Sequence, residues 1–207
     1  MADFFRTDVN DRSFIRGAAR ILYAPISQPR PTKLSDVIAL TSGSGGVAQY
    51  DARPNWVDLG ATKTGIQISV NNSEETFDVD QIYGDIASQP TAWEVSVATQ
   101  LAEFTPQKLQ VAWEGSAITT ANGEEVIGFG QPTSYTQRRL AVLFQRPDST
   151  IRGYFFWRVQ RTPQESTVTH AKTGEQVSIP VRFKVLAETA ITDPYSRYFE
   201  IHDQSYS

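Results

Sequence analysis

Residues 78–115 read DVDQIYGDIASQPTAWEVSVATQLAEFTPQKLQVAWEG, and they decide the fold class. In the middle of this block, apolar side chains alternate with small and polar ones over nine residues, which predicts a half-buried β-strand. Its apolar face is formed by Trp93, Val95, Val97, Thr99 and Leu101. Its polar face is formed by Glu94, Ser96, Ala98 and Gln100. One face therefore packs on a core, while the other meets water or a polar partner.

The ends of this strand and the helix after it are also marked in the sequence. Gln89-Pro90 is the expected start of the strand, because a residue before proline is pushed to extended geometry. Thr105 suits a helix N-cap, Pro106 the first helical position and Gly115 the position after the helix. A helix of about eight residues does not persist alone in water, so its apolar face, with Trp113, must dock. Closing one end of a sandwich and contacting a neighbouring subunit both stay open.

Length and composition limit the possible functions. A chain of 207 residues predicts one domain with extensions. The absence of cysteine excludes disulfides and thiolate metal sites. The net charge of −4 does not favour tight binding to nucleic acid, which depends on basic side chains. No run approaches the ~20 apolar residues of a membrane span, so no membrane association is expected.

Three segments of this single domain, residues 1–207, are predicted to lie outside its regular sheet. Residues 1–12 are polar and are expected to form an N-terminal arm, and residues 192–207 a polar and aromatic C-terminal arm. Residues 24–64 are rich in proline and glycine and are expected to form a long assembly loop. Loops of this length are uncommon and usually functional or disordered. A subunit contact and a solvated excursion both remain possible for it.

The rest of the chain predicts about eight strands and one helix, an antiparallel β-sandwich or barrel-like α+β fold. Residues 71–75 are expected to be a turn between strands 65–70 and 76–80. Aromatic residues on both faces of strand 153–160 indicate burial by the core and by a partner. Further strands or short extended elements are expected at 14–23, 124–128, 140–145, 167–170 and 176–186.

The sequence contains no pattern of residues that supports catalysis. His170 and His202 lack a second ligand at metal spacing, and no zinc or nucleophile-elbow motif occurs. Asp78, Asp80 and Asp85 do not follow a calcium-loop spacing, so hydrated loop carboxylates are the better interpretation. No catalytic residue, metal or cofactor is therefore predicted, and the protein is not expected to be an enzyme.

Three stretches of the sequence carry a family resemblance. They are FDVDQ (77–81) leading through Gly84-Asp85 and Pro90 into WEVSV (93–97) and LAE (101–103), RGAARILYAP (16–25), and IPVRFKVLA (179–187). Together they resemble the major tail tube proteins of long-tailed bacteriophages, and the resemblance spans most of the chain.

This resemblance implies a structural virion protein that stacks as hexameric rings into a tail tube for DNA ejection. The polar strand face of Glu94, Ser96, Ala98 and Gln100 is then the candidate lumen lining of an acidic wall. Arg182 and Lys184 fit such a wall poorly and are expected to pair with carboxylates of the next subunit. Candidate inter-subunit contacts are Asp78, Asp80, Gln81, Tyr83, Asp85, Arg182, Lys184 and Trp113.

The implied partners are further copies of the chain and other tail proteins: tape measure, terminator, and baseplate or distal tail components. DNA would only pass through, and assembly would take place in the host cytoplasm before the protein joins the virion tail. The alternative is a monomeric or trimeric carbohydrate-binding or decoration β-sandwich. That function requires an exposed aromatic platform, for which Trp56, Trp113 and Trp157 are candidates.

Overall fold

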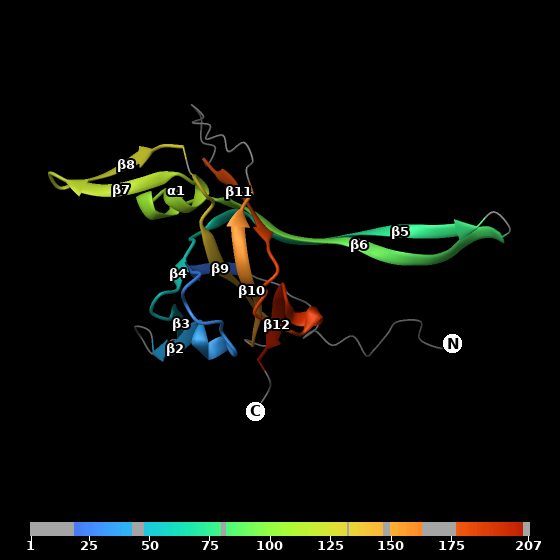
Figure 1. The fold of residues 1–207 in the computed structure, drawn as a ribbon. Coiled ribbons are helices and arrows are strands. Elements are labelled where there is room, and N and C mark those ends of the chain that lie inside the picture. Colours follow the sequence, from blue (N-terminus) through green and yellow to red (C-terminus); the bar gives the residue numbers. More distant parts are fainter. Residues whose placement is uncertain are drawn as a thin grey trace, which may run out of the picture. The chain divides into compact units, whose positions relative to one another are not determined.

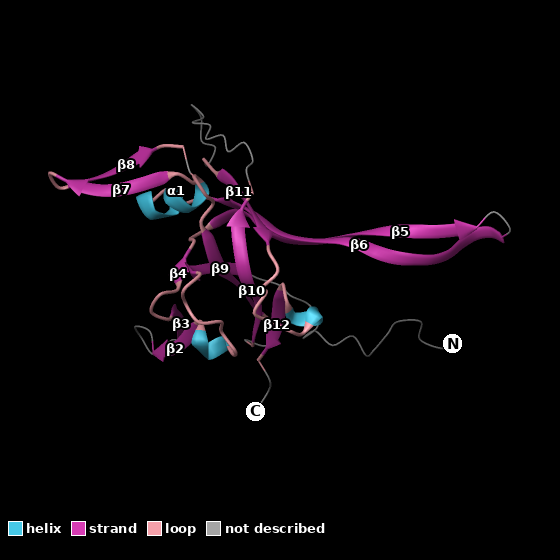
Figure 2. Ribbon diagram, viewed as in Figure 1, coloured by secondary structure: helices cyan, strands magenta, loops and turns pink. Residues whose placement is uncertain are grey.

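Over the residues that the structure describes, the protein is mainly antiparallel β-structure with one short α-helix, which confirms the predicted class (Figures 1 and 2). The computed structural model describes residues 19–42, 48–79, 82–131, 133–146, 150–162 and 177–204. The predicted N-terminal arm, residues 1–12, lies outside them. The chain divides into two compact units, each described separately below. Unit 1 comprises residues 1–61, 137–158 and 188–207, and unit 2 comprises residues 62–136 and 159–187.

Unit 1 contains the strand order β4–β1–β9–β10, with β12 paired to β10. These strands are β1 (Ala19–Pro25), β4 (Val57–Asp58), β9 (Gln137–Gln145), β10 (Ile151–Arg161, of which 151–158 belong to unit 1) and β12 (Phe199–Asp203). A separate ladder joins β2 (Ile38–Ser42) and β3 (Ala48–Ala52), and two short 3-10 helices are η2 (Leu34–Asp36) and η4 (Pro194–Ser196).

The core of unit 1 lies on one face of β1, β9 and β10. Phe155 and Trp157 of β10 are buried there with Leu22 of β1. Gly153 lets Leu34 lie close to the strand, because a Cβ at this position would lie 2.6 Å from Cδ2 of Leu34 and the leucine side chain would have to move. This distance is well inside van der Waals contact, so η2 packs directly over the β10 backbone.

The opposite face of β10 is covered by the chain itself. Phe156 is only 1% exposed, and its ring centroid lies 5.3 Å from that of Phe199 in β12. The prediction that a partner covers this second aromatic face is therefore wrong, because β12 supplies the cover. It also follows that the segment 192–207, expected as an arm, contributes a paired strand.

The segment 24–64 is more regular than its composition indicates. A long loop is the prediction for it, yet η2, β2, β3 and β4 all lie in it. Val37 and Trp56 are buried and tie the segment to the unit 1 core. Whether it also acts as an assembly loop stays a prediction.

Unit 2 contains the strand order β10–β11–β6–β5, with only Val159–Arg161 of β10 taking part. The other strands are β5 (Thr62–Val79), β6 (Ile82–Leu101) and β11 (Ile179–Val185). The helix α1 (Pro106–Ala112) follows β6, and β7 (Ser116–Ala121) pairs with β8 (Glu124–Phe129) as a separate hairpin.

The β5–β6 hairpin is much longer than predicted. The expected turn at 71–75 is wrong, because these residues continue β5 and pair with residues 89–94 of β6. β6 likewise begins at Ile82 rather than after Gln89-Pro90. Pro90 is tolerated because it lies at a register shift, opposite Glu74, where β6 has no partner on its other edge among the described residues.

Candidate functional site

The predicted polar face lies on the three strands β5, β6 and β11. Directly opposed residues of an antiparallel ladder share a face. Ser96 lies opposite Lys184 of β11 and Ser69 of β5, and Ala98 lies opposite Arg182 and Gln67. We call this surface the polar face. It is formed by Gln67, Ser69, Asn71, Glu94, Ser96, Ala98, Gln100, Arg182 and Lys184.

The cations of the polar face are paired within the same chain. Nζ of Lys184 lies 3.8 Å from Oε1 of Glu94. A guanidinium nitrogen of Arg182 donates to Oγ of Ser96 at 3.1 Å, and Ser96 is only 3% exposed. These residues were predicted as two separate sets, one facing a lumen and one facing a neighbour. The structure places both sets on one surface, which carries one carboxylate and two cations.

The other face of the same sheet is the core of unit 2. Val95, Val97 and Leu101 of β6 are each at most 1% exposed, as predicted. Thr99 is also buried, and its hydroxyl donates to the carbonyl oxygen of Thr64 at 3.3 Å. Trp93 differs from the prediction because it is 49% exposed. The apolar face therefore continues outward beyond the part that the chain itself covers.

The outer part of the β5–β6 hairpin has only two strands. β11 pairs with β6 from Val95 to Leu101, so from Glu94 outward β6 pairs with β5 alone among the described residues. β5 is the last strand of its sheet. Residues 71–79 span about 30 Å at the usual rise of a strand. This length of ladder presents unpaired backbone groups on both edges, and such edges are templates for pairing with another chain.

The predicted contact residues of the DVDQIYGD segment belong to the tip of this hairpin. Asp78 lies at the end of β5, and Tyr83 and Asp85 lie at the start of β6. Asp80 and Gln81 lie outside the described residues. Their role as contacts stays a prediction.

The hairpin and the few residues after it also carry an excess of negative charge. Between Thr64 and Gln107 the sequence contains seven carboxylates and no lysine or arginine. Glu74 and Glu75 are both exposed on β5. The net charge of −4 therefore reflects a local concentration of carboxylates on one hairpin rather than an evenly acidic surface. Composition alone gives only the sign of the net charge, whereas the distribution of charged residues along the sequence shows where the carboxylates are concentrated.

Helix α1 and the β7–β8 hairpin form a second surface of unit 2. Helix α1 begins after Thr105, as predicted, and buries Val111 and Ala112. Trp113, predicted as a subunit contact, packs edge-on against Phe129 of β8 with ring centroids 5.4 Å apart. Phe129 itself is 57% exposed, so the pair forms an apolar spot on the surface of the single chain.

The β7–β8 hairpin was predicted only in part, although its turn is visible in the sequence. Asn122 and Gly123 have φ values of 55° and 81°. Asn-Gly is the usual pair for a two-residue turn with both φ values positive. The dipeptide, placed between two extended runs, is the signal that predicts this hairpin.

The three tryptophans named as candidates for a carbohydrate platform are not a row of exposed rings. Trp56 and Trp157 are 5% and 2% exposed, and both belong to the unit 1 core. Trp113 packs on Phe129. A flat row of exposed rings, as the alternative function requires, is therefore not formed by the three candidates.

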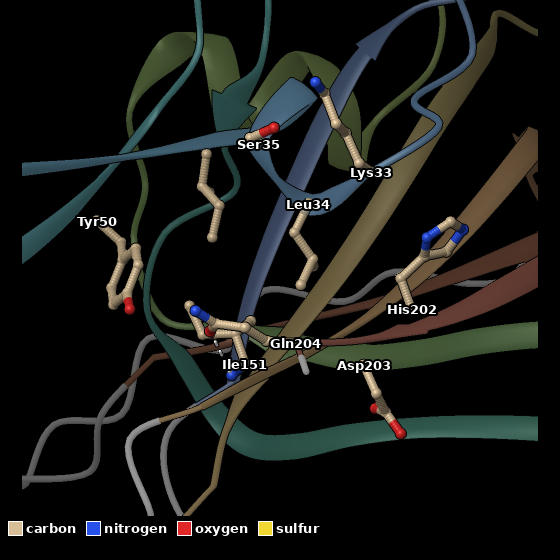
Figure 3. A pocket seen from close by; sticks show the side chains of 9 residues that line it. Lys33, Leu34, Ser35, Tyr50, Ile151, His202, Asp203 and Gln204 are labelled. Carbon is tan, nitrogen blue, oxygen red and sulfur yellow. Dashed lines mark hydrogen bonds between the residues drawn. The ribbon is translucent and has the colours of Figure 1, made fainter. Parts of the chain in front are cut away.

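A hollow in unit 1 is lined in part by His202, one of the two histidines of the sequence (Figure 3). In Figure 3, Leu34 lies across the hollow from Ile151 and Gln204. The His202 ring packs on Phe155 with centroids 4.8 Å apart, and its Nε2 lies 3.1 Å from Glu200. These contacts hold the His202 ring in the packing of unit 1. His170 lies outside the described residues.

The carboxylate at the edge of this hollow, Asp203, forms ion pairs with two arginines. Asp203 accepts from Nε of Arg152 at 2.6 Å and contacts Arg146 at 2.6 Å. The hydrogen bond from Arg152 lowers the pKa of Asp203, and the charge of Arg146 acts in the same direction. This cluster fixes β12 against β10 and leaves no free carboxylate for acid or base chemistry at the hollow.

Among the residues that the structure describes, no group of three potential ligands lies close enough together to hold a metal ion. Across the same residues, none of the helices combines the length and the apolar character needed to cross a membrane.

Comparisons with known proteins identify the family. A family model described as phage tail tube protein matches residues 8–200. No curated protein matches the sequence. A solved structure, described as the anti-feeding prophage (AFP) baseplate, 6-fold symmetrised, contains a similar chain with 9% identity and a TM-score of 0.45, covering 92% of this chain and 97% of that one. The chain therefore belongs to the phage tail tube protein family and is a structural component of the virion tail, not an enzyme.

Proposed function

We propose that the chain assembles into hexameric rings, that the rings stack into the tail tube, and that DNA passes through the tube during ejection. The observation that carries this proposal is the two-stranded outer part of the β5–β6 hairpin. Within the part of the chain that the structure describes, its edges are unpaired over about 30 Å, and isolated two-stranded ladders are marginally stable in water. Pairing these edges with neighbouring copies in a closed ring removes them.

The polar face is the surface that we assign to the lumen. It continues from β6 onto β5 and β11, and it is formed by polar and small side chains. Its two cations have intrachain partners, Glu94 for Lys184 and Ser96 for Arg182. Glu94 limits the attraction of Lys184 for phosphate, whereas the uncharged Ser96 holds Arg182 in place without neutralising it. With one carboxylate and two cations the face is only weakly charged, so a wall that is not purely acidic still suits a conduit.

The assigned lumen residues now include some that were predicted as neighbour contacts. Glu94, Ala98 and Gln100 remain in the set, and Arg182 and Lys184 join it because they share their face. Ser96 contributes through Arg182, which covers it. The partners that we propose, besides further copies, are the tape measure, terminator, and baseplate or distal tail proteins, which would meet the ends or the interior of the tube.

The experiment is direct imaging of assembly. Purified protein at high concentration is examined by negative-stain electron microscopy, and the rings are classified by their rotational symmetry. We expect hollow rings and tubes with six copies in each ring. A protein that remains monomeric under all assembly conditions, and in lysates of infected cells, contradicts the proposal. Rings of another symmetry contradict the hexamer alone.

A further inference from the structure

Unit 1 carries a groove with an excess of basic side chains. It is bordered by Arg30, Lys33 and Arg53, all exposed, and by Trp56 at its base. Arg30 lies over the ring of Trp157 at 5.9 Å, and Nε of Arg53 donates to the carbonyl oxygen of Ser35 at 3.0 Å. These contacts hold the two guanidinium groups in place without neutralising their charge.

The groove has one carboxylate among the described residues that line it, and that carboxylate is already used. Asp36 accepts from the backbone N–H of Thr32 at 2.9 Å and from that of Lys33 at 3.2 Å. The Thr32 hydroxyl also donates to it at 3.1 Å. These hydrogen bonds lower the pKa of Asp36, the Thr32 backbone bond most of all. Asp36 therefore stays ionised and the charge of Lys33 acts on it, so three cations against one carboxylate leave the groove with an excess of positive charge for an external carboxylate.

The same sequence contains a segment of matching charge. Glu74 and Glu75 are both exposed on the two-stranded part of β5, inside a run of 44 residues without a lysine or arginine. Successive side chains of a strand point to opposite faces, so this segment presents one carboxylate on each face of the ladder. They lie where the ladder has free edges, so a second chain can approach them. Complementary charged surfaces on copies of one chain favour association in a defined register.

We propose that the Glu74–Glu75 segment of one copy docks in the groove formed by Arg30, Lys33 and Arg53 of another copy. This contact rests on the proposed assembly, and it names the surface that receives the hairpin. It is heterologous, because two different patches meet, and such contacts generate rings or continuous filaments.

Charge reversal tests the contact, with the second acidic hairpin as its control. The hairpin variant is E74K/E75K, and the groove variant is R30E/K33E. The control variant, E124K/E125K, makes the same charge change at the exposed start of β8. Each protein is melted to check its fold, and its critical concentration for tube assembly is measured by light scattering and electron microscopy at low and high salt.

We expect the hairpin and groove variants each to raise the critical concentration at low salt by about tenfold or more, because attraction is replaced by repulsion. The control variant should assemble like the natural protein. A mixture of the hairpin and groove variants should assemble again, because the lysines of one then meet the glutamates of the other. Restoration in the mixture shows that the contact joins two molecules. Added salt should reduce both the loss of assembly in each variant alone and its restoration in the mixture.

Two results overturn the inference while leaving the proposed function intact. In the first, the natural protein forms tubes, and the hairpin and groove variants, each assayed alone, form tubes at the same critical concentration. That first result includes the case in which the groove serves DNA instead. The other is a mixture that does not assemble although each variant melts like the natural protein. If the natural protein itself forms no tubes, the proposed function fails first.

Discussion

Replacing Glu94 with lysine should make the polar face adhere to DNA. In the natural chain this face carries one carboxylate, Glu94, and two cations, Arg182 and Lys184. The substitution leaves three cations and no carboxylate, and it places the new lysine beside Lys184. Glu94 and Lys184 are both about half exposed, so their pair stabilises the fold little and the variant should fold normally.

The size of the effect follows from counterion release. Each additional phosphate contact steepens the dependence of log K on log salt by about 0.9. One new contact from each of six copies would therefore add about 5 to the slope for a ring. The assay measures binding of duplex DNA to assembled tubes from low to high salt, together with the rate of genome release from virions that carry the change.

We expect a steeper salt dependence and slower release for Glu94→Lys. The matched control is Glu124→Lys, which makes the same charge change at an exposed position of β8. Equal slopes and equal release rates for the two variants would refute the assignment of the polar face to the lumen.

Three further changes test the packing of the single chain. Phe156→Ala should lower the free energy of unfolding by about 3–5 kcal/mol in chemical denaturation, whereas Phe129→Ala, at an exposed site, should cost under about 1 kcal/mol. Because arginine contacts lower the pKa of Asp203, its stabilising effect is present above the ordinary carboxyl pKa and is lost as pH falls below it. Asp203→Asn should therefore reduce the difference in melting temperature between pH 6 and about pH 3; an unchanged difference argues against this role. Gly123→Ala should lower the free energy of opening of the β7–β8 hairpin, measured by amide hydrogen exchange, by about 1–2 kcal/mol, because the φ of Gly123 is 81°. Gly128→Ala should leave this free energy unchanged, because a Cβ on Gly128 would meet open space.

Elements with strong periodicity were predictable from the sequence. The alternation from Val95 to Leu101 and that from Ile179 to Val185 both match the buried positions of β6 and β11. The helix after Thr105 was predictable because its first residues carry local backbone preferences that do not depend on tertiary packing.

Elements that depend on pairing with distant strands were not predictable. The run Asn71–Glu75 has the composition of a turn, yet the ladder with residues 89–94 keeps it extended. Gln89-Pro90 predicts the start of a strand, but Pro90 lies inside β6. It is tolerated there because of a register shift in the ladder, which the sequence around the proline does not reveal. The polar face was predicted for β6, but its cations come from β11, and only the register reveals that they share a surface.

The carboxylates of the long hairpin also bear on the protein before it is assembled. A chain with two free strand edges is at risk of uncontrolled edge-to-edge aggregation while it waits in solution. Mutual repulsion between the carboxylates of the β5–β6 hairpins of different molecules opposes that pairing. Growth would then be favoured only where a neighbour offers cations, so the unassembled pool can stay soluble at high concentration until an existing end of the tube accepts the next copy.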